Sequence, residues 1–323
     1  MTVRAAFALM RAGLASALLF FAGAVVPVLG EAVMVFAAVP VLSFAVGFPY
    51  ALLRVFGVVA FASGIVTLLG GGIAGAGYAV TFGMSAAIMC YMLERRQPFE
   101  SIVLCATAAV ITVGALVAFA IAGTPAALAQ ILHGELTTAM TRGQEFYKTF
   151  GIDAAITADT RVEVVNAVLR LSPALACISA AFMVLANLGL FWRIGGRQQR
   201  VGYPLFGDLA KWSAPEWLVW MLIAPGFLTV FGSYIPVEPL NTIALDLFLV
   251  VLAVYFCQGL AIMAFYFKVL AMPPLARGLI YFVTIVQPIL VALVCAAGVF
   301  DLWIDFRRLK PPSREARNLG DFF

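Results

Sequence analysis

The stretch LNTIALDLFLVVLAVYFCQGLAIMAFYFKV, residues 240–269, decides the fold of this chain. Only two of its residues, Asp246 and Lys268, are charged. A helix that crosses a lipid bilayer needs about 20 consecutive, mostly apolar residues, and this stretch is longer than that. The stretch therefore predicts a transmembrane helix.

The composition extends this prediction to the whole chain. Of 323 residues, 64% are hydrophobic and 11% are charged, whereas about 25% are charged in an ordinary soluble domain. Such a chain has too little polar surface to cover a core in water, so we predict an all-α polytopic membrane protein. The net charge of +4 comes from short basic clusters between apolar segments, a pattern typical of topology determinants rather than of a nucleic-acid-binding surface.

Apolar segments on both sides of residues 240–269 predict further spans within one integral membrane domain, 1–323. Nine crossings would place the basic tail, 304–323, on the opposite side from the N-terminus. We therefore expect eight crossings, or nine, and the segment that crosses incompletely is either 31–48 or 216–235. The nine candidates are 5–26, 31–48, 53–70, 76–93, 101–123, 165–193, 216–235, 240–269 and 278–303.

Residues 124–164 differ from these segments because charged and apolar residues alternate at near-helical spacing. The pattern predicts an amphipathic helix or helix pair on the membrane surface or over the end of the bundle. The short loops on the N-terminal side carry Lys and Arg, and the opposite loops carry none, so we expect a cytoplasmic N-terminus in a multi-pass arrangement.

Polar residues inside the predicted spans are the candidate binding residues, because burying them is unfavourable and often marks a pathway or a helix contact. Asp246 is either a substrate or cation ligand or a water-exposed acid near the interface. Tyr255 and Gln258 share one face of the same helix, suited to a small-molecule pocket or to interhelical bonding. Asn241 precedes them, and Gln287 lies beside Pro288, where we expect a kink.

Two acids close the last apolar segment in GVFDLWIDFRRLK, residues 298–310. Asp301 falls on the inward stripe of the helix, and Asp305 lies three residues before Arg308, its expected local partner. We predict a structural anchor at the membrane edge. A carboxylate pair also suits acid–base chemistry, but the adjacent arginines favour ionised acids, so we do not expect an enzyme.

The sequence predicts neither a metal site nor a cofactor. His133 is the single histidine, the five cysteines form no CxxC pair, and the glycine-rich stretch 70–77 lacks the Lys-Ser or Lys-Thr of a phosphate-binding loop. Ala8, Ala12 and Ser16 form a row of small residues on the first helix. Such a row lets another helix approach closely, either within the chain or from a partner.

Several stretches of the C-terminal half resemble the YybS-like family of predicted bacterial membrane proteins (DUF2232). The stretches are WSAPEWLVW, Asn241, YFCQGLAIMAFYF and GVFDLWIDFRR, in that order within residues 212–308. The family is distantly similar to the S components of energy-coupling-factor transporters, which are helical, bind small molecules and dock a transmembrane coupling subunit through small residues on the first helix. The resemblance implies a location in the bacterial inner membrane and gives Ala8, Ala12 and Ser16 that docking role.

Three functions follow as hypotheses. The first is a small-molecule binding or transport subunit in the lipid bilayer, served by a coupling subunit with a separate ATPase. The second is a membrane scaffold or assembly factor that acts through protein contacts. The third, an intramembrane enzyme, requires two carboxylates that converge on a water-accessible cavity.

Overall fold

The computed structural model describes residues 3–25, 29–149, 158–194, 209–231 and 238–308. Within these ranges the regular structure is entirely helical, which confirms the all-α prediction. The chain divides into two compact units, Met1–Leu205 (unit 1) and Phe206–Phe323 (unit 2), each described by itself below. The single domain predicted for the chain stays a prediction, and most of the predicted tail, from residue 309 on, lies outside the described residues.

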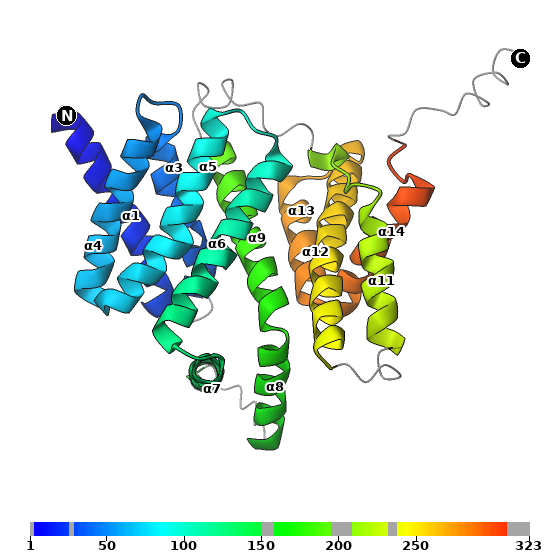
Figure 1. Cartoon of the computed structure of the whole chain (residues 1–323). Helices are drawn as coiled ribbons and strands as arrows, with labels where there is room; N and C mark the ends of the chain where they lie inside the picture. Colours follow the sequence, from blue (N-terminus) through cyan, green and yellow to red (C-terminus); the bar gives the residue numbers. More distant parts are fainter. Residues whose placement is uncertain (1–2, 26–28, 150–157, 195–208, 232–237, 309–323) are drawn as a thin grey trace, which may run out of the picture. The chain divides into compact units, whose positions relative to one another are not determined.

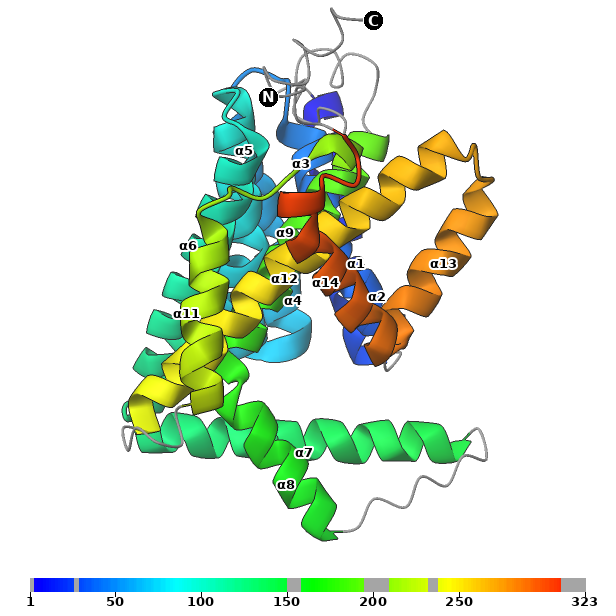
Figure 2. The same ribbon diagram turned by 90° about the vertical axis from the view of Figure 1, so that its right-hand side faces the viewer.

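Unit 1 is a bundle of helices with one helix, α7, running across its end (Figures 1 and 2). Its elements are α1 (Val3–Val25), α2 (Leu29–Met34), the 3₁₀ turn η1 (Val35–Ala38), α3 (Val39–Ala45), α4 (Ala51–Tyr78), the π-helical turn η2 (Ala79–Gly83), α5 (Met84–Glu94), α6 (Phe99–Ala122), α7 (Pro125–Thr149), α8 (Ala158–Arg170) and α9 (Ser172–Ile194).

The second apolar segment of unit 1 is broken rather than continuous. The turn η1 separates α2 from α3, and Pro40 lies in the first turn of α3. Gly30 of α2 lies so close to α1 that a Cβ there would be 1.8 Å from the carbonyl oxygen of Ala22. The broken segment is therefore held tightly against the first helix.

Gly71 interrupts α4 with a positive φ of 87°. Beyond it, a Cβ at Gly75 would lie 1.9 Å from Thr67 Oγ1, and a Cβ at Gly83 would lie 2.6 Å from Val59 Cγ1. Residues on the two sides of Gly71 are therefore packed against each other. The chain folds back within the predicted turn 70–77, at a backbone conformation that favours glycine.

The amphipathic segment forms two helices, α7 and α8, and residues 150–157 between them lie outside the described residues. Figure 2 shows α7 running across the end of the other unit 1 helices, and Figure 1 shows it end-on. Arg161 of α8 donates a hydrogen bond of 2.7 Å to Gln144 Oε1 of α7. The location of this pair on the membrane surface stays a prediction.

Unit 2 contains the 3₁₀ turn η3 (Leu209–Lys211) and the helices α11 (Leu218–Phe231), α12 (Glu238–Val269), α13 (Pro274–Val286) and α14 (Pro288–Ile304). Its tightest contact is the crossing of α12 and α14. A Cβ at Gly298 would lie 2.1 Å from Tyr255 O, and one at Gly259 would lie 2.1 Å from Val294 O. Glycine at both positions therefore lets the two backbones touch.

The last predicted span, 278–303, is not one helix. It consists of α13 and α14, which are bent by 103° at the break beside Pro288. Gln287 at the break has an extended backbone, φ −98° and ψ 110°. Pro288 lacks an N–H and disfavours a helical conformation in the residue before it, which explains why the expected kink becomes a sharp bend.

The predicted count of eight or nine spans is not supported. The described chain has five helices that are long and apolar enough to cross a membrane, or six when the bent pair counts as one. By length and composition the run Ala51–Glu94 counts as one candidate, although Gly71 folds it back. The suspected segments are too short, because Leu29–Ala45 and Leu218–Phe231 each fall below 18 residues. The five are Val3–Gly23, Ala51–Glu94, Phe99–Ala122, Ser172–Ile194 and Leu240–Val269.

Candidate functional site

A buried polar network joins three separate parts of unit 2. The side-chain amide of Gln258, on α12, accepts a hydrogen bond from the Ala214 N–H (3.1 Å) and donates one to Asp301 Oδ2 on α14 (3.2 Å). Gln258 is completely buried, and Asp301 is 6% exposed. The three sequence stretches WSAPEW, YFCQGL and GVFDLWIDFRR therefore meet at one point.

Arg307 completes this network with the charge that Asp301 needs. Its guanidinium lies 2.7 Å from Asp301 Oδ2, and it also donates to the carbonyl oxygens of Ala210 (2.9 Å) and Trp212 (2.7 Å). The second carboxylate oxygen of Asp301 accepts from the Phe306 N–H (3.0 Å). Further hydrogen bonds stabilise a buried ion pair. Here they engage both oxygens of Asp301 and both Nη atoms of Arg307, whereas the buried Nε of Arg307 has no partner among the described residues.

The local backbone explains how Arg307 reaches Asp301. Helix α14 ends at Ile304, and Asp305 takes a left-handed conformation with φ 47°. This residue turns the chain back toward the helix end, so that Arg307 approaches an acid six positions earlier. Arg308, which is exposed, donates its N–H to Asp305 O at 2.9 Å. The predicted side-chain pair of Asp305 with Arg308 stays a prediction, and the buried acid uses Arg307 instead.

Asp246 stands in contrast to Asp301, whose two carboxylate oxygens both accept hydrogen bonds. Asp246 lies on α12, inside the candidate span Leu240–Val269, and is half-buried. Its Oδ1 atom is buried, and within the described residues it has no hydrogen-bond partner. A buried polar atom without a partner is rare in proteins, so a water, ion or ligand is the expected partner here.

The other predicted binding residues differ from one another in burial and in position along the helices. Asn241 is half-buried near the start of α12, and Gln287 is exposed at the bend between α13 and α14. Tyr255 is completely buried, and its hydroxyl has no hydrogen-bond partner within the described residues. It packs with Ala214 and Val251 in an apolar cluster. The structure therefore brings Gln258 to Asp301 and separates it from Gln287.

The row of small residues on α1 faces the interior of unit 1. Ser16 is completely buried and Ala12 is 8% exposed, while Ala8 is half-buried. Beside this row, a Cβ at Gly13 would lie 2.6 Å from the Phe61 ring of α4. The close helix approach that the row predicts therefore takes place within the chain.

A second buried polar centre, which the sequence reasoning missed, surrounds the broken segment of unit 1. Ser16 Oγ donates to the carbonyl oxygen of Ala37 in η1, so Tyr78 donates its hydroxyl to Ser16 (2.6 Å). Asn187 of α9 donates to Val35 O (2.7 Å), and its own Oδ1 has no partner among the described residues. The sequence signal that could have revealed this centre is Asn187, the one amide side chain in the segment Ser172–Ile194.

Two cavities open at the surfaces of the described units, and neither includes Asp246 or Gln258. One, of about 510 Å³, lies between α7, α8 and α9 of unit 1. The other, of about 360 Å³, is lined by Glu216, Trp217, Val219, Trp220, Leu302 and Trp303 of unit 2. In the described part of the chain, groups of three or more His, Cys, Asp or Glu residues arranged to hold a metal ion are absent.

The exposed faces of the helices define the class of protein. Phe7, Leu68, Leu104 and Ile289 are between 69% and 86% exposed, and they belong to four different helices. Apolar surface of this extent is typical of contact with lipid. Together with the candidate spans, it makes this chain an integral, multi-pass helical membrane protein.

The family follows from a direct comparison. A family model described as "Predicted membrane protein (DUF2232)" matches residues 14–302, so the chain belongs to this family. Neither the curated proteins nor the solved structures include a significant match.

Proposed function

We propose that this protein is a small-molecule binding or transport subunit of the bacterial inner membrane that lacks its own ATPase. The observation that supports the proposal is the buried, unpartnered Oδ1 of Asp246 in a candidate span. A carboxylate oxygen in that position accepts a hydrogen bond or contacts a cation, so the ligand class is a cation or a molecule with an N–H or O–H donor. The assigned role is binding rather than catalysis.

We also propose that the protein is similar to YybS-like proteins and to S components. Its proposed partner is a transmembrane coupling subunit with a separate ATPase. It also includes a cytoplasmic N-terminus. Because Ala12 and Ser16 are buried within unit 1, this row is not available to a partner. The proposed docking surface is therefore another, lipid-facing part of the bundle.

Extraction of the protein into nanodiscs with native lipid, followed by mass spectrometry of bound small molecules, tests the proposal. Asp246→Asn keeps the shape of the side chain and removes its charge. Asp159→Asn makes the same change at an exposed acid of α8. We expect a bound molecule that is present in the wild type and Asp159→Asn and absent in Asp246→Asn. The same set of molecules in all three preparations would contradict the proposal.

A membrane scaffold or assembly factor is the second candidate. The observation that favours it is the complete burial of Gln258 and Tyr255, which fills the centre of unit 2 with structural contacts. A scaffold would copurify with the same protein partner whether or not Asp246 is substituted. Loss of that partner in Asp246→Asn alone would favour the binding subunit instead.

A further inference from the structure

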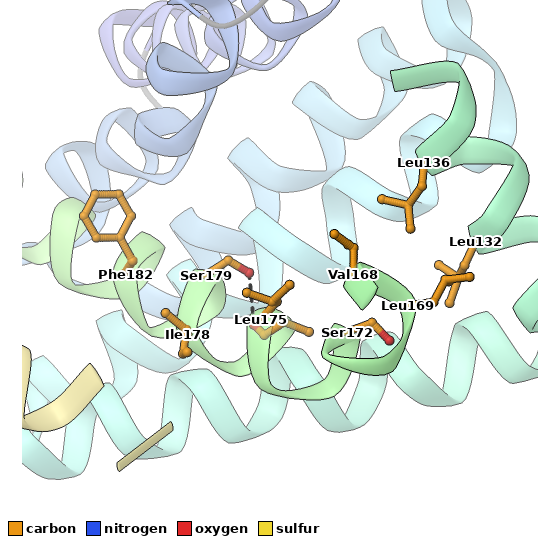
Figure 3. A pocket seen from close by; sticks show the side chains of 10 residues that line it. Leu132, Leu136, Val168, Leu169, Ser172, Leu175, Ile178, Ser179 and Phe182 are labelled. Carbon is orange, nitrogen blue, oxygen red and sulfur yellow. Dashed lines mark hydrogen bonds between the residues drawn. The ribbon is translucent and has the colours of Figure 1, made fainter. Parts of the chain in front are cut away.

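The cavity between α7, α8 and α9 runs along one helix from its end toward its middle. Figure 3 shows Leu132 and Leu136 of α7 beside Val168 and Leu169 of α8, with side chains of α9 continuing to Phe182. The cavity measures about 510 Å³, and its walls are almost entirely apolar. All three helices belong to unit 1, so the shape of the cavity does not depend on the placement of unit 2.

The length of this groove matches one leaflet of a bilayer. Ser172, at one end, is the first residue of the candidate span Ser172–Ile194, and Phe182 lies ten residues further. At 1.5 Å per residue this distance is about 15 Å. The hydrocarbon core of a bilayer is about 30 Å thick, so the groove extends from the edge of the core to its midplane.

The two ends of the groove differ in chemistry in the way that the two ends of a lipid differ. The inner end is formed by aliphatic and aromatic side chains such as Ile178 and Phe182. The outer end contains the hydroxyl of Ser172, and Arg170 lies between Leu169 and this serine in the chain. Arg170 is exposed and makes no ion pair with a described residue. A guanidinium at the membrane edge that pairs with no described residue can donate two parallel hydrogen bonds to a headgroup phosphate.

We propose that this groove binds one acyl chain of an anionic phospholipid, whose headgroup phosphate contacts Arg170 and Ser172. The transverse helix α7 covers the part of the acyl chain nearest the headgroup, through Leu132 and Leu136. This binding holds α7 against α8 and α9, in addition to the hydrogen bond of Arg161 to Gln144. The proposal does not depend on ligand binding at Asp246, which lies in unit 2.

Two pairs of variants test the contribution of the apolar groove and that of its charged end separately. Ala176→Trp fills the groove at an exposed position of α9, and Ala108→Trp places the same side chain on the exposed face of α6. Arg170→Gln removes the charge at the groove, and Arg142→Gln removes an exposed charge of α7. All four positions are exposed or at the groove surface, so the bundle is expected to fold in each variant.

The experiment uses native mass spectrometry of the full chain after exchange into micelles with equal amounts of phosphatidylglycerol and phosphatidylcholine. We expect one retained phosphatidylglycerol in the wild type and in both controls, and none in Ala176→Trp. Arg170→Gln is expected to reduce the preference for phosphatidylglycerol about fivefold, because one basic residue near a membrane surface contributes about 1 kcal/mol. Equal retention of phosphatidylglycerol by Ala176→Trp and Ala108→Trp would contradict acyl-chain binding in the groove. An unchanged preference for phosphatidylglycerol in Arg170→Gln would contradict the headgroup contact.

Discussion

Two positions on α12, Asp246 and Gln258, lie twelve residues and therefore about 18 Å apart along the same helix. At Gln258 both ends of the amide are bonded, and its neighbour Asp301 is paired with Arg307. At Asp246 one carboxylate oxygen is buried without a partner among the described residues. On the same helix, the fold thus satisfies the side chain of Gln258 but leaves Asp246 Oδ1, like the Tyr255 hydroxyl, without a partner among the described residues.

This difference separates structural polar groups from candidate binding groups. A buried polar group with all its hydrogen bonds made contributes to the stability and uniqueness of the fold. A buried polar group without a partner destabilises the fold unless something else supplies the bond. Substitution at the two positions should therefore have opposite effects on stability, and the following predictions test this contrast.

The largest effect is expected for Arg307→Met. The substitution leaves the buried Asp301 without its counter-charge, and breaking a buried pair on one side destabilises a protein by about 3–5 kcal/mol. Unfolding in mixed micelles measures this loss. Arg308→Met is the matched control, because Arg308 is exposed, and its effect should stay within about 0.5 kcal/mol. Equal losses for the two variants would contradict the role of Arg307.

A double variant sharpens this result. Asp301→Leu with Arg307→Met replaces the pair by apolar side chains of similar size, so neither charge is left alone. We expect the double variant to be more stable than Arg307→Met. If the loss of stability in the double variant equals the sum of the losses in Asp301→Leu and Arg307→Met, the two residues do not act as a pair.

The next effect is expected for Gly298→Ala. The added Cβ would lie 2.1 Å from Tyr255 O, so the α12 and α14 backbones have to separate. Overpacking of this kind destabilises by about 1–3 kcal/mol, and a backbone contact belongs at the upper end. The control is Gly278→Ala on α13, where a Cβ meets nothing within 4 Å. There alanine should be neutral or stabilising by up to about 1 kcal/mol.

The apolar pattern predicted the helical class and most long helices, because bilayer thickness and hydropathy constrain these directly. The bounds of α1, α6 and α12 agree with the predicted segments within about two residues. The predicted span count is not supported, because the helices at 31–48 and 216–235 are too short and the run Ala51–Glu94 counts as one candidate. Hydropathy alone did not predict the break at η1, where Ser16 and Asn187 bond to backbone carbonyl groups.

The sequence also predicted the inward stripe that carries Asp301, which is buried as expected. It missed the partner, because helical periodicity does not place residues six apart on one face. Arg307 reaches Asp301 only after Asp305 adopts a positive φ. Such a conformation is uncommon for residues other than glycine, and its position follows from tertiary contacts rather than from a local pattern.

Gln258→Ala should have an intermediate effect. It removes the acceptor of the buried Ala214 N–H and the donor to Asp301, and an unsatisfied buried group destabilises by about 1–3 kcal/mol. Thermal unfolding in nanodiscs should show a lower midpoint. Thr284→Ala on α13 is a suitable comparison, because among the described residues that buried side chain bonds only to Ile280 O in its own helix. A smaller loss of stability for Gln258→Ala than for Thr284→Ala would contradict the role of Gln258 in the buried network.

The smallest effect, and the one with the opposite sign, is expected for Asp246→Leu. Removing a buried acceptor that has no partner should stabilise the empty protein by about 1 kcal/mol, whereas Asp301→Leu should destabilise it. Freshly extracted protein adds a second comparison. A ligand bound to the folded state raises stability, so Asp246→Leu should be less stable than the wild type before exhaustive washing and more stable after it. A reversal on washing supports a ligand at Asp246. A loss of stability in both preparations would show that Asp246 is part of the fold, as Asp301 is, and the two positions on α12 would no longer differ.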